Sequence, residues 1–301
     1  MMKKNKYVRP LRDMSVMLFD MLKSDRDTNI GIGGFTGEGK SSFLTHLFKD
    51  YGIVSGMGWS FNLLTWSRKE LLLWIDGDKK SEPDEDGLLK GQKPEYSALG
   101  VDELFLLFYK RNWYDEGQID SIGTLNMCRD RHLLIGGNIP NFWDLDSAFT
   151  SRIRFYVYIP YRGVAWVFEQ ENNPFAIDKW NVTQNKNIFR KFKNPYMCPN
   201  FLMEIHYPDW SPKEKIRYYE IRNKKRVKAI DVNKSDKQER YKDIKSQRDR
   251  LIKLLLDWNN DIIQYDDIKE RLGIEKLTYK DLSDILGISP SAVRLIALGE
   301  R

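Results

Sequence analysis

A glycine-rich segment constrains the fold of this chain more than any other feature. Residues 34–41, GFTGEGKS, match the pattern GxxxxGK(S/T) at every fixed position. The glycines allow the backbone to curl so that successive N–H groups point at phosphate oxygens, and a helix that begins here adds the positive end of its dipole. A short apolar strand over 28–32 precedes the segment and a helical pattern over 42–49 follows it. This is the context that a phosphate-binding loop requires.

The pattern assigns chemistry to individual residues of this loop. Lys40 is expected to reach the β- and γ-phosphates, and the hydroxyl of Ser41 is expected to ligate Mg²⁺. The motif identifies the nucleotide phosphates and not the base. ATP is the nucleotide that we expect, and the sequence has no convincing NKxD motif for reading guanine. The expected nucleotide-binding set is Gly34, Thr36, Gly37, Glu38, Gly39, Lys40, Ser41 and Ser42.

A pair of carboxylates follows a later apolar segment. Asp102 and Glu103 come after residues 97–101 and lie 61 residues beyond the loop serine, which is typical of a Walker B strand. We expect Asp102 to hold Mg²⁺ through water, and Glu103 to orient the attacking water and accept its proton. The alternative is that Asp102 caps a helix beginning at Leu104, and both roles are compatible. Asp76, which follows another apolar run, ranks second because it lacks an adjoining glutamate.

Polar residues beside two further strands complete the candidate catalytic set. The apolar run 133–137 ends in Asn138, which we expect to bond the attacking water or the γ-phosphate; the alternative is an ordinary turn residue before Pro140. Arg152 and Arg154 lie at the beginning of the next strand, and one of them is expected to stabilise transition-state charge on a neighbouring subunit's γ-phosphate. The alternative is a solvated or salt-bridged pair. Alternating strands and helices up to about residue 160 predict an open, mostly parallel α/β sheet.

Together these segments resemble the FtsK/HerA group of P-loop ATPases and the related Zot-like ATPases of viruses and mobile elements. The likeness lies in the phosphate loop, 101–104 (VDEL), 131–140 (RHLLIGGNIP) and 151–155 (SRIRF), within about residues 28–170. It implies a RecA-like P-loop NTPase sheet with helices on both faces, a homo-oligomeric ring, and ATP-driven movement of DNA. The sequence departs from FtsK-type motors, where glutamine is usual at the position of Asn138.

A second pattern lies near the end of the sequence. Residues 277–296 resemble a helix-turn-helix, with Gly287 at the turn and Ser289 and Pro290 suited to begin the second helix. That helix is expected to enter the DNA major groove, although a small protein-docking unit is the alternative. The expected DNA-binding residues are Ser289, Ser291, Ala292 and Arg294.

Positive charge is concentrated just before this unit. Residues 213–253 contain 16 Lys or Arg and 7 Asp or Glu, although the whole chain carries only +6. A localised excess of this kind indicates a polyanionic partner, which we expect to be double-stranded DNA. The expected organisation is a P-loop ATPase domain with a β-rich extension over 1–212, a basic helical linker over 213–260, and an all-α helix-turn-helix unit over 261–301.

The composition of the chain argues against several other classes of protein. Two cysteines exclude a disulfide framework, and three histidines without metal-ligand spacing argue against structural zinc. No apolar run approaches the ~20 residues of a membrane span, so we expect a soluble cytoplasmic protein, in the host cytoplasm if the chain is viral. The leading hypothesis is a DNA-associated Mg²⁺-ATPase that moves, packages or transfers DNA. The alternatives are an ATP-switched DNA-binding adaptor or initiator with slow turnover, and an ATPase for virion or secretion assembly.

Overall fold

The computed structural model of the chain contains two compact units, Met1–Ala229 and Ile230–Arg301. The structure describes residues 7–26, 28–104, 107–108, 123, 128–172, 176–227, 245–246, 248–249, 252, 280, 283 and 289–297. The second unit is described only in short pieces, of which helix α10 (Pro290–Ala297) is the longest. Within the described ranges, no helix is both long and apolar enough to cross a bilayer.

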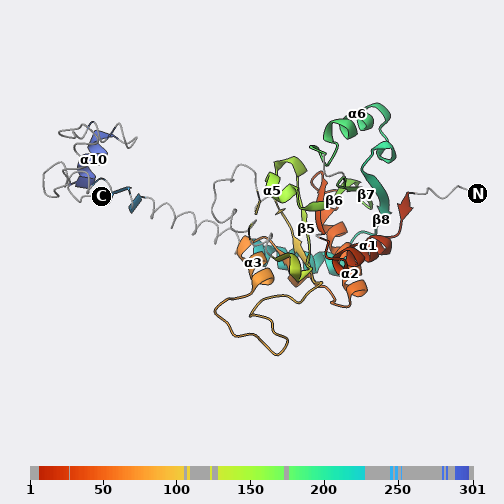
Figure 1. Cartoon of the computed structure of the whole chain (residues 1–301), viewed down its shortest axis with the longest axis horizontal. Coiled ribbons are helices and arrows are strands. Elements are labelled where there is room, and N and C mark those ends of the chain that lie inside the picture. The colour runs from red at the N-terminus through yellow and green to blue at the C-terminus, as the bar shows by residue number, and fades with distance from the viewer. Residues whose placement is uncertain are drawn as a thin grey trace, which may run out of the picture. The chain divides into compact units, whose positions relative to one another are not determined.

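The first unit is built around an eight-stranded mixed sheet with the strand order β1-β8-β7-β6-β2-β5-β4-β3 (Figure 1). Neighbouring strands from β6 through β2, β5 and β4 to β3 run parallel, whereas β7 is antiparallel to both β6 and β8, and β1 is parallel to β8. The strands are β1 (Val8–Arg9), β2 (Asn29–Gly34), β3 (Leu64–Thr65), β4 (Ala98–Val101), β5 (Leu134–Asn138), β6 (Ile153–Tyr161), β7 (Val164–Glu169) and β8 (Phe201–His206).

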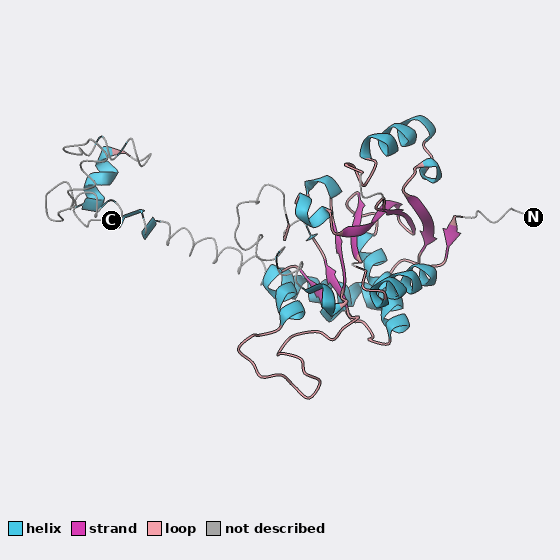
Figure 2. Cartoon of the chain, viewed as in Figure 1, coloured by secondary structure: helices cyan, strands magenta, loops and turns pink. Residues whose placement is uncertain are grey.

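Helices accompany these strands along the chain (Figure 2). The α-helices are α1 (Leu11–Lys23), α2 (Lys40–Ser55), α3 (Arg68–Asp76), α5 (Ser147–Thr150) and α6 (Val182–Phe192), together with a helix over 212–227. Short 3₁₀ helices cover Phe61–Leu63, Cys128–Arg131, Phe142–Asp144 and Pro195–Met197. Residues 77–97 contain neither helix nor strand.

Two apolar clusters fill the core on opposite faces of the sheet. On one face, Phe43 and Phe48 of α2 pack with Ile30 of β2. On the other, Leu71 of α3 packs with Leu99 of β4. Successive residues of a strand point to opposite faces, and the neighbours Ala98 and Leu99 accordingly belong to different clusters. Helices therefore cover both faces of the sheet, as expected.

The predicted α/β sheet is confirmed. The strands expected at 28–32 and 97–101 are present as β2 and β4, and the strand expected beside Arg152 and Arg154 is β6. Beyond β6 the chain turns back at Gly163, whose φ is +89°, so β7 and β8 extend the sheet with antiparallel pairing. Most of the expected helix-turn-helix lies outside the described residues, which include α10 but not the turn before Ser289.

Candidate nucleotide site

The glycine-rich loop joins the carboxyl end of β2 to the first turn of α2. Gly34, Gly37 and Gly39 have φ values of +140°, +90° and +95°, which side chains other than hydrogen rarely tolerate. A Cβ on Gly34 would lie 2.6 Å from the carbonyl oxygen of Ile159 in β6. Glycine is therefore required at this position both by its backbone angle and by the close approach of the neighbouring strand.

Lys40 is held by its own loop. Its Nζ donates to the carbonyl oxygens of Gly34 at 2.7 Å and Phe35 at 2.9 Å. Partial burial lowers the pKa of Lys40, and the nearby carboxylates of Glu103 and Asp102 oppose that shift. The ammonium group therefore lies at the mouth of the loop, bonded to two carbonyl oxygens. The oxygens of a triphosphate would be stronger acceptors for it than these carbonyls.

Three strands bring the predicted polar residues together. β2, β4 and β5 are parallel, so their carboxyl ends meet at one edge of the sheet, and β5 lies between the other two. Ser41 Oγ, which follows β2, donates to Asp102 Oδ1 at the end of β4 at 2.9 Å. Asn138 Nδ2, at the end of β5, donates to Ser41 Oγ at 2.9 Å and also to Asp102 Oδ1. The position of β5 between the other strands explains why Asn138 contacts both partners.

This cluster fits a magnesium ion. A hydroxyl and a carboxylate oxygen 2.9 Å apart supply the hard oxygen ligands that Mg²⁺ prefers. Asp102 and Asn138 are both buried, and among the described residues Asn138 Oδ1 has no hydrogen-bond partner. Ser41 and Asp102 are the residues that would hold the ion. The competing carboxylate, Asp76, ends α3 and is paired with Lys79.

A cavity of about 340 Å³ opens over this cluster. Glu103 lines it with a φ of +84°, in the left-handed region. From the expected set, the lining residues are Thr36, Gly37, Gly39, Lys40, Ser41, Ser42, Asp102, Glu103 and Asn138. The remaining lining residues are Pro140, Arg162, Asp209, Trp210, Lys215, Tyr218, Tyr219 and Arg222. The sequence therefore did not predict nearly half of the residues that line the cavity.

The turn between β6 and β7 supplies one of these unexpected contacts. Arg162 donates through one guanidinium nitrogen to the carbonyl of Gly37 at 2.9 Å and through another to Asp209 Oδ2 at 2.8 Å. The hydroxyl of Tyr207 donates to the carbonyl of Gly39 at 3.3 Å. Partial burial alone would raise the pKa of Asp209, but hydrogen bonds from the backbone N–H of Trp210 and from Arg162 lower it. These contacts hold the carbonyls of Gly37 and Gly39 in place.

The helix over 212–227 supplies four more of the unexpected lining residues, Lys215, Tyr218, Tyr219 and Arg222. Its beginning carries a capping box, in which Ser211 and Glu214 exchange hydrogen bonds, so the sequence SPKE did contain a helix-start signal. Glu214 also pairs with Lys49 of α2. Near the other end, Lys225 Nζ donates to Glu70 Oε1 and to the carbonyl of Leu64, both at 2.8 Å.

Tyr218 of this helix reaches the centre of the site. Its hydroxyl donates to Asp102 Oδ2 and lies 3.3 Å from Ser41 Oγ. Burial raises the pKa of Tyr218, and the Asp102 carboxylate raises it further, so the phenol stays protonated and acts as a donor. Its ring packs on Trp210 with centroids 4.4 Å apart, and Trp210 Nε1 donates to Thr45 Oγ1 at 2.6 Å.

The other predicted residues lie elsewhere. Arg152 precedes β6 and Arg154 lies near its beginning, at the edge of the sheet opposite the phosphate loop, because β6 is parallel to β2. Arg154 pairs with Glu169 Oε1 at 2.5 Å. In the second unit, Ser289 precedes α10 and Ala292 lies within it, while the side chains of Ser291 and Arg294 are exposed.

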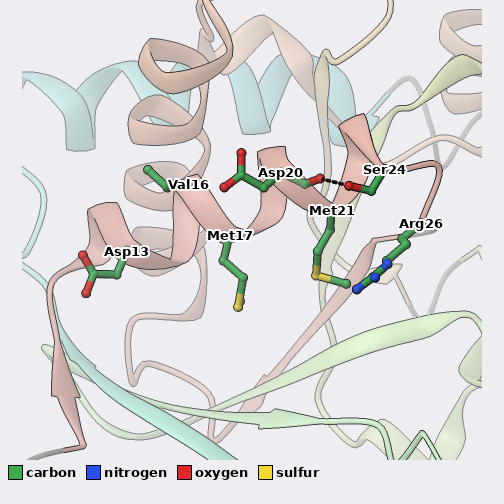
Figure 3. A pocket seen from close by; sticks show the side chains of 7 residues that line it. All are labelled: Asp13, Val16, Met17, Asp20, Met21, Ser24 and Arg26. Atoms are coloured by element: carbon green, nitrogen blue, oxygen red, sulfur yellow. Dashed lines mark hydrogen bonds between the residues drawn. The ribbon is translucent and has the colours of Figure 1, made fainter.

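A second pocket, of about 520 Å³, lies along α1 (Figure 3). Its lining residues are Asp13, Val16, Met17, Asp20, Met21, Ser24 and Arg26. All of them belong to α1 or to the three residues that follow it, and Ser24 Oγ is already bonded to the carbonyl of Asp20. The pocket therefore brings no chemistry together from separate elements.

The strand, glycine-rich loop and helix, set in a mixed α/β sheet, agree with a P-loop NTPase fold. No family model matches the sequence, and no curated protein matches it. Solved structures with some likeness include C. elegans PCH-2, at 14% identity and a TM-score of 0.35 over 50% of this chain and 42% of that chain. The chain thus matches less than half of the length of PCH-2.

Two further structures match most of their own length. The genome packaging NTPase B204 of Sulfolobus turreted icosahedral virus 2 is 10% identical with a TM-score of 0.32, covering 48% of this chain and 92% of that chain. The N-terminal domain of zonular occludens toxin from Neisseria meningitidis is 15% identical with a TM-score of 0.28, covering 54% of this chain and 91% of that chain. Likeness at these TM-scores transfers no function.

Proposed function

We propose that this chain is a Mg²⁺-dependent ATPase that acts on double-stranded DNA, working as a ring of identical subunits that moves, packages or transfers it. The contact between Ser41 Oγ and Asp102 Oδ1 at 2.9 Å carries the nucleotide part of this proposal. It joins the end of a phosphate-binding loop to a buried carboxylate on another strand. A glycine-rich turn that occurred by chance would not be expected to contact a buried carboxylate on another strand.

The residues around the cavity suggest a division of labour. Lys40 exchanges its loop carbonyls for the β- and γ-phosphates, and the loop N–H groups bind the phosphate oxygens. Glu103 accepts the proton of the attacking water, and Asn138 orients that water. Mg²⁺, when bound, neutralises charge on the phosphate oxygens. Arg152 or Arg154 acts on a neighbouring subunit's nucleotide, and Arg154 must leave Glu169 to do so.

The DNA part of the proposal is supported by charge. The excess of Lys and Arg over residues 213–253 suits a phosphate backbone, and binding through it weakens steeply as salt rises. In this proposal α10 carries the base contacts, with Arg294 as its most suitable side chain. Ser289, Ser291 and Ala292 complete the proposed contact surface.

The proposal is tested by measuring ATP hydrolysis with and without duplex DNA. Wild type is expected to turn over faster with DNA. Glu103→Gln is expected to lose at least ~100-fold of that rate, as for loss of a general base, while still binding ATPγS. Glu95→Gln, an exposed carboxylate outside the cavity, is the matched control.

Other outcomes point to the other functions. A slow rate indifferent to DNA, with DNA binding intact, would favour an ATP-switched adaptor or initiator. Hydrolysis without any DNA binding would favour an ATPase for virion or secretion assembly. Full activity in Glu103→Gln would show that another group activates the water.

A further inference from the structure

The hydrogen bonds around Ser41 and Asp102 occupy the atoms that a metal ion needs. Ser41 Oγ gives its one proton to Asp102 Oδ1 and accepts a hydrogen bond from Asn138 Nδ2 at 2.9 Å. The Tyr218 hydroxyl approaches the same oxygen at 3.3 Å and gives its proton to Asp102 Oδ2. A phenol has one proton, so Tyr218 donates to Asp102, and its hydroxyl oxygen lies beside Ser41 Oγ without donating to it. A metal ion that binds Ser41 and Asp102 together must take the place of one of these neighbours.

Tyr218 is the neighbour that can withdraw at the lower cost. Asn138 belongs to β5, in the middle of the sheet, and its contact with Ser41 is the shorter one. Tyr218 comes from the helix over 212–227, outside the sheet. Mg²⁺ requires oxygens at about 2.0–2.1 Å in near-octahedral order and keeps several waters. The phenol hydroxyl contacts both of the residues that would hold the ion.

We propose that the Tyr218 hydroxyl competes with Mg²⁺ for Ser41 and Asp102, so that binding of Mg²⁺ with nucleotide displaces Tyr218 and loosens the helix over 212–227. This inference rests on the proposed nucleotide-binding function. Tyr218 is a positioning residue in this scheme, because it keeps the two metal ligands together while the ion is absent.

The contacts around Tyr218 determine which segment its displacement disturbs. The helix is fastened on both sides of Tyr218, by the pair between Glu214 and Lys49 and by the bonds of Lys225 to Glu70 and Leu64. The Tyr218 ring also packs on Trp210. Displacing the side chain therefore disturbs a segment with several fixed points. The same helix carries Lys215 and Arg222, which line the cavity, and the sequence continues from it into the remainder of the Lys- and Arg-rich stretch.

The sign of one mutational effect tests this competition. Binding of ATPγS is followed while Mg²⁺ is titrated, in the full chain and in Tyr218→Phe. Losing a competing hydrogen bond to a carboxylate is expected to lower the half-saturating Mg²⁺ concentration about tenfold. If Tyr218 instead steadies Asp102 while the metal is bound, the variant will need ten- to a hundredfold more Mg²⁺, and the inference is overturned.

Tyr196→Phe is the matched control for this substitution. Its hydroxyl also donates to a carboxylate, Glu204 Oε2, at 2.7 Å, but neither residue lines the nucleotide cavity. Its Mg²⁺ dependence is expected to equal that of the wild type. Unchanged Mg²⁺ dependence in Tyr218→Phe, with normal ATPγS binding, would overturn the inference and leave the proposed function intact. Absence of ATPγS binding in the wild type would overturn both.

A measurement on the wild-type chain covers the case in which Tyr218→Phe does not fold. Backbone hydrogen exchange over 212–227 is compared at saturating ATPγS with either EDTA or Mg²⁺. Exchange is expected to be faster with Mg²⁺ in this helix, while α6, which has no residue in the cavity, provides the internal control. Equal or slower exchange over 212–227 with Mg²⁺ would overturn the inference.

Discussion

The junction between the phosphate loop and β6 leaves no room for a methyl group, and this can be tested by one pair of substitutions. Gly34 and Gly37 belong to the same loop and both have positive φ, at +140° and +90°. A Cβ on Gly34 would lie 2.6 Å from the carbonyl oxygen of Ile159, whereas a Cβ on Gly37 would have no atom within 4 Å. Gly34→Ala and Gly37→Ala therefore share a backbone penalty and differ in the steric one.

The magnitudes follow from this difference. Placing alanine at positive φ costs about 1–2 kcal/mol, partly offset by ~0.4–1 kcal/mol from the lower entropy of the unfolded chain. Gly37→Ala should therefore cost about 1 kcal/mol of unfolding free energy. Gly34→Ala adds an overpacking term of about 1–3 kcal/mol, because the obstacle is a backbone carbonyl in a central strand pair and not a flexible side chain. We expect Gly34→Ala to be the more destabilising by about 2 kcal/mol.

Urea denaturation followed by tryptophan fluorescence, without nucleotide, measures this difference. With a slope of about 2 kcal/mol per M, a gap of ~2 kcal/mol moves the midpoint by about 1 M. Equal midpoints for the two variants would refute the tight approach of β6 to the loop. A Gly37→Ala variant less stable than Gly34→Ala would refute the reasoning as a whole.

Two further predictions concern the groups that fasten the site. Arg162→Ala should raise the Kd for ATPγS about fivefold, since the loop loses its hydrogen bond at Gly37. It should change the stability little, because Arg162 and Asp209 are about half exposed. Calorimetric titration measures the affinity and thermal unfolding measures the stability, and an unaltered affinity would contradict the role of Arg162 in holding the loop. Partial burial alone would raise the pKa of Glu214, but hydrogen bonds from Lys49 and Ser211 lower it from 4.5 to about 2. The stabilisation that Glu214 contributes is therefore complete above pH ~4.5 and is lost as the pH falls toward 2. The stability gap between wild type and Glu214→Gln should therefore shrink over that range, and a gap that widens as pH falls would contradict the sign.

The parts of this site that were predictable are those encoded by neighbouring residues. The phosphate loop is a contiguous pattern, and Asp102 and Asn138 each follow an apolar run that forms a strand. Parallel strands then bring those ends to one edge of the sheet. The sequence therefore indicated which residues meet, although Ser41 and Asp102 are 61 positions apart.

Contacts made by the returning chain could not be read in the same way. Tyr218 is 177 positions from Ser41, and Arg162 is 125 positions from Gly37. Residues 213–227 are rich in Lys and Arg, which on a single helix usually indicates a solvated surface. Only the tertiary fold shows that one tyrosine of this helix faces inward. The roles expected of Arg152, Arg154 and the α10 residues involve a neighbouring subunit or DNA, so they stay predictions.

The pairing of β1 with β8 has a consequence for how this unit is made. Val8 pairs with Glu204, so the first and last strands of the sheet along the chain become neighbours only after almost 200 positions have been synthesised. Tyr207 and Tyr218, which contact the loop and the pair formed by Ser41 and Asp102, emerge later still. Pairings of such long range are slow to form and leave sheet edges exposed in the meantime. On the ribosome, the glycine-rich loop is therefore synthesised long before its contacts can form, and the proposed nucleotide site is completed late in synthesis.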